Sequence, residues 1–210
     1  MMIAGLKSRL LTGALILMLA PAAPAADIAA GKATYALCVV CHGADGEGNA
    51  AMQAPMLAGQ EAWYLKRQLE NFRRGLRGAA DGDSYGAQMR PIAQVIDAFP
   101  TEADLIAYIV SLPSQTAKPA IVGDASAGKA VYAACATCHG RNAEGNEQLA
   151  APRLAGRDDW YLARQLDNYR IGRRGYDRED VFGMQMRAMA ATLAGDQAVN
   201  DVVAFIATLK

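Results

Sequence analysis

The sequence contains two copies of one segment. An ungapped match at an offset of 97 residues aligns residues 31–112 with residues 128–209 of the 210-residue chain. Polar and glycine-containing stretches recur, including Glu47-Gly48-Asn49 with Glu144-Gly145-Asn146 and Arg67-Gln68-Leu69 with Arg164-Gln165-Leu166. Helical periodicity alone would repeat only apolar positions, so this agreement indicates a tandem duplication of one folding unit.

The two copies are separated by a short linker. Residues 113–124 contain Pro113 and Pro119 and no amphipathic period, which indicates an extended segment that is stiff near the prolines. We therefore predict one domain over residues 26–112 and a second over residues 125–210. Domains of this size bury a small core, and such units often complete the core with a metal or a cofactor.

The N-terminal residues are typical of a secretory signal peptide. Basic residues precede an apolar run over residues 10–20, and Ala23-Pro24-Ala25 supplies the small residues of a cleavage site. We predict a signal peptide over residues 1–25, cleaved near Ala25 or Ala26, and hence export to the periplasm. An uncleaved anchor is the alternative, but the run is shorter than the ~20 residues needed to cross a bilayer.

Each copy has the pattern of a helical domain. Residues 60–74 carry apolar side chains near helical spacing, residues 29–37 lead into a cysteine motif, and Thr101 is a candidate N-cap for a last helix. Stretches rich in glycine and aspartate, over residues 44–49 and 78–86, are predicted to be loops. No run of residues favours strands, so the predicted fold class is all-α.

The chemistry of the chain centres on its cysteines. Cys38-Val-Val-Cys41-His42 and Cys135-Ala-Thr-Cys138-His139 both have the C-x-x-C-H spacing of a c-type haem attachment site. Two thiols at this spacing reach the two vinyl groups of one haem, and the adjacent imidazole becomes the proximal ligand of its iron. A redox dithiol would need a βαβ context, and a zinc site would need further histidines or cysteines. The chain has only two histidines and four cysteines. We therefore predict two covalently bound haems c.

The sixth iron ligand is predicted to be methionine. Both histidines serve as proximal ligands, which leaves methionine, lysine, tyrosine or an open site. Met89 and Met186 are the methionines that correspond to each other at the offset of 97 residues. A single methionine is more often a core filler, but the recurrence favours ligation. A neutral thioether raises the reduction potential and closes the site to substrates, as expected of an electron carrier that is not an enzyme.

The combined motifs resemble the dihaem cytochromes c of the c4 type. The resemblance rests on the C-x-x-C-H pairs, the P-x-L-A-G stretch before a W-Y-L-x-R-Q-L helix, and the late Gln-Met-Arg. It implies two class I cytochrome c domains in a pseudo-twofold arrangement, each with a His/Met-ligated haem. It further implies that the carbonyls of Pro55 and Pro152 accept a hydrogen bond from Nδ1 of His42 and His139. It implies shuttling of electrons towards a terminal oxidase or another periplasmic acceptor.

Other repeated polar residues have more than one interpretation. They could hold haem propionates, pack between the domains or solvate a helix face. This set comprises Arg67 and Arg164, Trp63 and Trp160, Tyr64 and Tyr161, Arg73 and Arg170, and Gln88 and Gln185.

Charge excludes one class of partner and suggests another. Basic and acidic side chains number 21 each, without the basic stripe of a nucleic-acid binder. Residues 26–112 have a net charge of −3 and residues 125–210 of +1. We hypothesise that different redox partners approach the two haems, so that charge reversal at Arg173 and Arg174 would change the salt dependence of a partner reaction. Scattered solvated charge is the alternative.

The sequence thus favours a dihaem electron carrier that exchanges electrons with a redox protein donor and acceptor. A membrane respiratory complex or terminal oxidase is the expected acceptor, with peripheral membrane association as an option. The alternative is the cytochrome subunit of a periplasmic redox enzyme, such as a flavoprotein sulfide dehydrogenase or a thiosulfate oxidation system. A dihaem peroxidase would need an open haem site, which the paired methionines oppose.

Overall fold

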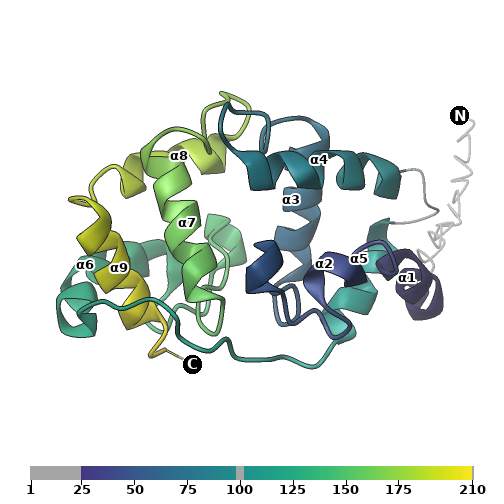
Figure 1. Ribbon diagram of the computed structural model, residues 1–210, viewed down its shortest axis with the longest axis horizontal. Coiled ribbons are helices and arrows are strands. Elements are labelled where there is room, and N and C mark those ends of the chain that lie inside the picture. Colours follow the sequence, from purple (N-terminus) through teal and green to yellow (C-terminus); the bar gives the residue numbers. More distant parts are fainter. Residues whose placement is uncertain (1–24, 98–101, 210) are drawn as a thin grey trace, which may run out of the picture.

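The computed structural model describes residues 25–97 and 102–209 as two helical halves that lie side by side (Figure 1). The predicted signal peptide, apart from its last residue, and the predicted N-cap at Thr101 lie outside the described residues. Within the described residues, β-pairing is limited to isolated bridges at equivalent places in the two halves. The all-α prediction is confirmed.

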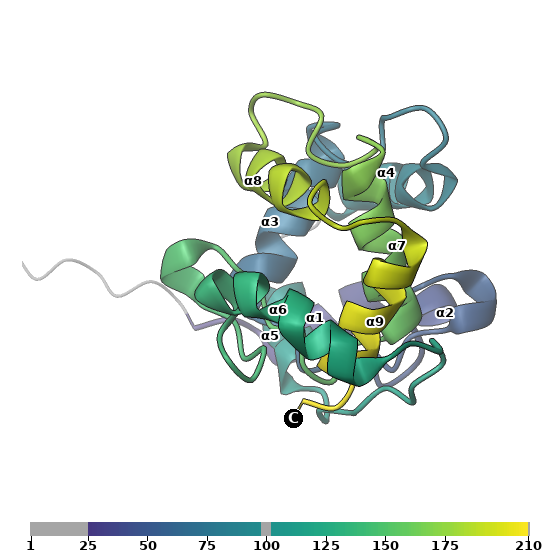
Figure 2. The same cartoon turned by 90° about the vertical axis from the view of Figure 1, so that its left-hand side faces the viewer.

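The two halves repeat one order of helices. The first half contains α1 (Ile28–Tyr35), α2 (Val39–His42), a 3₁₀ turn (Ala50–Met52), α3 (Ala62–Arg73), α4 (Ser84–Asp97) and α5 (Glu102–Ser111). The second half contains α6 (Ala125–His139), a 3₁₀ turn (Glu147–Leu149), α7 (Asp159–Arg170), α8 (Val181–Ala190) and α9 (Asp196–Ile206). Figure 2 shows α4 and α8 on one side of the molecule and α1, α5, α6 and α9 on the other.

The cysteine motif is reached differently in the two halves. Helix α6 continues without interruption to His139, whereas α1 ends at Tyr35 and the chain resumes as α2 at Val39. The N–H groups of residues 36–38 bond to carbonyls three residues back, which tightens the chain into a 3₁₀-like turn. The helix predicted over residues 29–37 therefore ends two residues early, while its type is as predicted.

One predicted loop is shorter than expected. The stretch 78–86 was expected to be a loop throughout, but α4 begins inside it at Ser84. Asp83 starts the helix because its carboxylate accepts a hydrogen bond from the Gly86 N–H at 2.9 Å. Asp180 does the same for α8 through the Gly183 N–H at 3.0 Å. The repeated aspartates therefore fix the start of the two helices that carry the repeated methionines.

The first and last helices of each half cross at a glycine. A Cβ atom at Gly128 on α6 would lie 1.9 Å from the carbonyl oxygen of Asp201 on α9. A Cβ atom at Gly31 on α1 would lie 2.0 Å from the carbonyl oxygen of Asp104 on α5. The absent side chains let the backbones approach closely, so that Val202 and its neighbours on α9 are buried against α6.

Gly128→Ala is expected to lower the free energy of unfolding by about 2–3 kcal/mol. The added methyl group meets backbone that no rotamer change can move aside, and such overpacking typically costs ~1–3 kcal/mol. Lys129→Ala, an exposed change on the same helix, serves as the control and is expected to stay within about 0.5 kcal/mol. Denaturant unfolding followed by far-UV circular dichroism measures both. Equal stability of the two variants would contradict the close crossing.

The segment between α5 and α6 is extended and lies along the lower edge of the molecule in Figure 1. It is fastened to the second half by Asp159, whose carboxylate accepts from the N–H groups of Ala120 and Ile121 at 2.5 and 2.7 Å. Among the helices of the described residues, none has both the length and the apolarity required to cross a bilayer.

Candidate functional site

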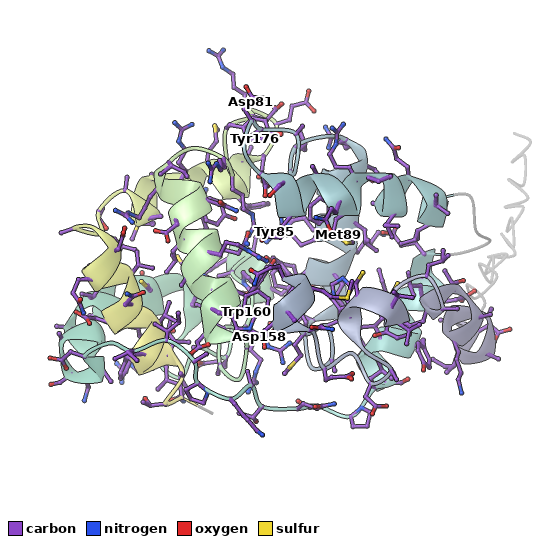
Figure 3. The ribbon with its side chains drawn as sticks, in the orientation of Figure 1. Asp81, Tyr85, Met89, Asp158, Trp160 and Tyr176 are labelled. Atoms are coloured by element: carbon purple, nitrogen blue, oxygen red, sulfur yellow. The ribbon has the colours of Figure 1, made fainter. Side chains whose placement is uncertain are left out.

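The first half has a cavity beside its cysteine motif. Its volume is about 100 Å³, and its walls are almost entirely apolar. Cys38, Cys41 and His42 line it at the end that α2 forms, and Met89 lines it from α4. Figure 3 shows Met89 pointing from α4 into this half of the molecule. The sequence-predicted thiols, imidazole and thioether of the first copy therefore meet in one place.

The second half has the equivalent cavity, with a larger volume of about 210 Å³. Cys135, Cys138 and His139 line it from the end of α6, and Met186 lines it from α8. This cavity also extends between the two halves, because Tyr64 of the first half contributes to its wall. The predicted residues of the second copy are again brought together.

The two histidines are held in one orientation. Nδ1 of His42 lies 2.7 Å from the carbonyl oxygen of Pro55, and Nδ1 of His139 lies 2.8 Å from that of Pro152. A carbonyl oxygen can only accept, so Nδ1 carries the proton and the lone pair remains on Nε2. Burial lowers the pKa of both imidazoles against the opposing effect of the proline carbonyls. The neutral imidazole that results is the form that ligates metals.

A tight turn follows each histidine and fixes its backbone. Gly43 has a φ of +83° and Gly140 of +84°, conformations that favour glycine. The carbonyl oxygens of these glycines accept hydrogen bonds at 2.8 Å from the hydroxyls of Tyr35 and Tyr132, which are buried in the core. Each motif is thereby tied back to the first helix of its own half.

The cysteines do not have the properties of a redox dithiol. None of the four is in a disulfide, and burial raises the pKa of the Cys38 thiol to about 11 and also raises that of Cys135. Redox-active dithiols instead need a lowered thiol pKa. No group of three histidine, cysteine, aspartate or glutamate side chains could hold a metal ion within residues 25–97 and 102–209. The residues that are present fit a haem better than either alternative.

The methionines divide by position. Met89 is the methionine that lines the first cavity, while Met56, Met186 and Met189 line the second. Met52 lies outside both cavities and is 45% exposed. The repeated pair is therefore placed equivalently in the two halves, and the second cavity contains two further sulfur atoms.

A buried polar cluster lies between the halves, and its central arginines were not predicted. Arg77 and Arg174 are 7% and 5% exposed, and neither has a carboxylate within ion-pair distance among the described residues. Arg77 donates to the hydroxyl of Tyr161 at 2.6 Å, and Arg174 donates to that of Tyr64 at 3.2 Å. The amide oxygens of Gln68 and Gln165 complete the cluster, each accepting from both arginines. The recurrence of these arginines at the offset of 97 residues was a usable signal, whereas their burial was not visible in the sequence.

The other repeated arginines fall into two groups. Arg67 donates to the carbonyl of Ala150 at 2.8 Å and Arg164 to that of Gln53 at 2.9 Å, so both join the halves. Arg164 also lies over the ring of Tyr85, which points from α4 towards the midline in Figure 3.

Arg73 and Arg170 instead form ion pairs inside their own halves, with Glu102 and Asp196 at 3.0 Å. These ion pairs join α3 to α5 and α7 to α9, and they do not correspond to arginines that solvate a helix face.

The docking role suggested for Arg174 is wrong. Its guanidinium is buried between the halves and cannot meet a partner protein. The prediction failed because the arginine content of the second copy gave no information about which side chains face solvent.

Further contacts join the two halves near Arg174. Arg74 forms an ion pair with Glu179, and the hydroxyl of Tyr176 (labelled in Figure 3) donates to the carbonyl of Gly75.

Two helical halves, each with a C-x-x-C-H motif and a methionine around one cavity, define a tandem dihaem cytochrome c. The chain belongs to the cytochrome c family, which matches residues 28–113 and again residues 125–210, and within it to the two-domain c4 type. Each domain binds one covalently attached haem c, and the chain transfers electrons.

Similar proteins include cytochromes c4 and a dedicated electron acceptor. Cytochrome c4 of Azotobacter vinelandii is 37% identical over 184 residues, covering 81% of this chain and 83% of the relative. The thiosulfate dehydrogenase electron acceptor of Stutzerimonas stutzeri (strain A1501) is 32% identical, covering 82% and 78%. The crystal structure of reduced recombinant cytochrome c4 from Pseudomonas stutzeri superposes with a TM-score of 0.67 at 31% identity, covering 89% of this chain and 100% of that one.

Proposed function

We propose that the chain is a periplasmic electron carrier in which His42 and Met89 ligate the first haem iron and His139 and Met186 the second. The observation that carries the proposal is the same in both halves. One buried imidazole, with its Nδ1 engaged by a proline carbonyl, lines a cavity together with the repeated methionine. We further propose domain boundaries at residues 26–112 and 125–210.

The chain's own residues would hold the cofactor in three ways. The thiols of Cys38 and Cys41, and of Cys135 and Cys138, would form the thioether bonds. The histidines would coordinate through Nε2, because Nδ1 is used by a carbonyl. The methionines would close the remaining side and exclude other ligands. When bound, the haem supplies a one-electron ferric/ferrous couple.

Arg77 and Arg174 are proposed to neutralise haem propionates. Two buried guanidinium groups without a carboxylate partner among the described residues need an anion nearby. Arg174 and Tyr64 also line the second cavity, where an acidic cofactor edge would lie within reach of them. Tyr64 and Tyr161 of this cluster were among the residues considered for the role in the sequence, whereas Arg77 and Arg174 were not. Arg73 and Arg170, which were considered, are engaged in ion pairs.

The proposed acceptor is a terminal oxidase or another membrane respiratory complex, reached after export directed by residues 1–25. A second candidate is the electron-accepting partner of a periplasmic dehydrogenase. It is favoured by the 32% identity to the thiosulfate dehydrogenase electron acceptor, with coverage of most of both chains. In either role the chain itself is proposed not to be an enzyme, because the methionines occupy the site where a substrate would bind.

A stopped-flow experiment tests the carrier role. Reduced protein is mixed with oxidase-containing membranes of the source cells, and haem oxidation is followed optically. We expect rapid oxidation of both haems that cyanide abolishes, and purification of the chain without a stable partner. Stoichiometric co-purification with a dehydrogenase would instead support the second candidate. Failure of the membranes to oxidise the protein would overturn the oxidase as acceptor.

A further inference from the structure

The peptide group between Pro55 and Met56 is hydrogen-bonded at both ends. Its carbonyl oxygen accepts from Nδ1 of His42 at 2.7 Å, and its N–H donates to the carboxylate of Asp158 at 2.7 Å. Asp158 belongs to the second half, so the chain of contacts crosses the boundary between the halves. Figure 3 shows Asp158 in the central region of the molecule, at the start of α7.

The equivalent peptide of the second half repeats this arrangement. The carbonyl of Pro152 accepts from Nδ1 of His139 at 2.8 Å, and the N–H of Arg153 donates to the carboxylate of Glu61 at 2.9 Å. Glu61 belongs to the first half. Each histidine is therefore linked, through a single peptide group, to a carboxylate of the opposite half.

The two carboxylates do not cap the helices at whose N-termini they lie. Glu61 and Asp158 are the N-cap residues of α3 and α7, a position where an acidic side chain commonly caps its own helix. Neither makes a side-chain capping bond there. Both instead reach across to the other half. The acids differ in length, and the residues that donate to them differ in type. The contact with the backbone is therefore the feature that the two halves share.

The surroundings of the two carboxylates favour a strong effect of their charge on the groups that they contact. Burial raises the pKa of both acids, while the N–H groups that they accept from and the nearby Arg157 favour their charged forms. Trp160 also favours the charged form of Asp158, and the neighbouring Asp159 opposes it. Among residues 25–97 and 102–209, the second oxygen of Glu61 is buried without a hydrogen-bond partner. A charge in such a poorly solvated place polarises the groups that it contacts more strongly than one in water.

A carboxylate that accepts from one end of a peptide group makes the carbonyl at the other end a stronger acceptor, because successive hydrogen bonds polarise one another. A stronger acceptor at Nδ1–H gives the imidazole more anionic character, which makes it a better ligand of ferric iron. We propose that Asp158 and Glu61 are positioning residues that lower the reduction potential of the haem in the opposite half. The proposal rests on the ligation by His42 and His139 proposed above.

Isosteric neutral variants of the holoprotein test the proposal. Asp158→Asn is expected to raise the potential of the His42 haem relative to that of the His139 haem, and Glu61→Gln is expected to do the reverse. We expect a roughly three- to tenfold change in the equilibrium constant for distributing one electron between the two haems. This is less than the roughly 10–100-fold effects seen when a group bonded directly to a metal-ligating residue is removed. A tenfold change is about 59 mV for one electron. Spectroelectrochemical titration measures it.

Proton NMR of the reduced proteins separates this coupling from loss of a nearby charge. The Nδ1–H resonance of His42 is expected to move in Asp158→Asn, and that of His139 in Glu61→Gln, with the other histidine unchanged in each case. Asp159→Asn provides the control. It removes the charge next to Asp158, but the Asp159 carboxylate accepts from the N–H groups of the linker and not from the peptide that contacts His42. It is expected to leave both Nδ1–H resonances in place.

The same spectra distinguish failure of the coupling from failure of the ligation. Ring-current-shifted resonances of the two histidines and of Met89 and Met186 in the wild-type protein report the ligation itself. If those resonances are absent, the proposed ligands are wrong. If they are present but the variants move neither Nδ1–H resonance, or move only the one in their own half, the cross-domain coupling is overturned.

Discussion

Replacing Cys135 and Cys138 together by serine is expected to reduce the covalent haem content from two per chain to one. A serine hydroxyl forms no thioether with a haem vinyl group, and the second motif has no other thiol within it. The first motif keeps its own thiols, so its haem is expected to be attached normally. Haem staining of a denaturing gel and the intact mass of the purified protein measure the loss.

The same change is expected to destabilise the second half. Without its haem this half retains a largely apolar cavity, which together with the space that it shares with the first half has a volume of about 210 Å³. At ~24 cal/mol per Å³, an unfilled cavity of that volume costs about 5 kcal/mol. That is comparable with the whole stability of a small domain, which is about 5–15 kcal/mol. We therefore expect part of the far-UV helical signal to melt at a lower temperature.

The matched variant changes Cys38 and Cys41 to serine. It is expected to remove the other haem and to leave a cavity of about 100 Å³, so it is also expected to lower the stability of its own half. Retention of two covalent haems by either double variant would contradict the assignment of these thiols.

Met186→Ala is expected to open the second haem to exogenous ligands and to lower its potential by on the order of 0.1 V. A thioether favours ferrous iron, and axial ligands together span roughly 0.8 V of haem potential, so its loss is a large perturbation. Carbon monoxide binding to the reduced variant and a redox titration measure the two effects.

Met189→Ala is the control for this change. Met189 lines the same cavity, but its counterpart in the first copy is Ile92, so it does not recur. The control is expected to keep both haems closed to carbon monoxide, and Met89→Ala is expected to reproduce the Met186 effect at the first haem. If Met189→Ala opens the second haem and Met186→Ala does not, the ligand has been assigned to the wrong sulfur.

The sequence was most informative where chemistry is local. The C-x-x-C-H spacing brings two thiols and an imidazole together within five residues. The recurrence of Met89 and Met186 selects one methionine per copy. In each half, the C-x-x-C-H motif and its methionine line one cavity, because each copy folds around its own motif. The boundaries of the helices were less well predicted. The glycine-rich stretch before Met89 was interpreted as a loop, although Asp83 within it caps the start of α4.

The partners that meet across the boundary between the halves could not be predicted. Arg77 and Gln165 lie 88 positions apart, and Asp158 and Met56 lie 102 apart. Such pairs depend on how the domains dock, which no local pattern describes. A buried arginine and a solvated one look identical in a sequence, and for that reason Arg174 was interpreted as a docking residue. At the centre of this surface, the hydrogen-bond acceptors of Arg77 and Arg174 are neutral amide and hydroxyl oxygens rather than acids.

The optical spectrum of the reduced holoprotein, recorded with and without carbon monoxide, is the most direct test of methionine ligation at both haems. If Met89 and Met186 close the two haem sites as proposed, carbon monoxide leaves the spectrum unchanged at both haems. Rapid binding of carbon monoxide at either haem would show an open or labile sixth position. That result would contradict the His/Met electron carrier and would point to a haem that binds a substrate.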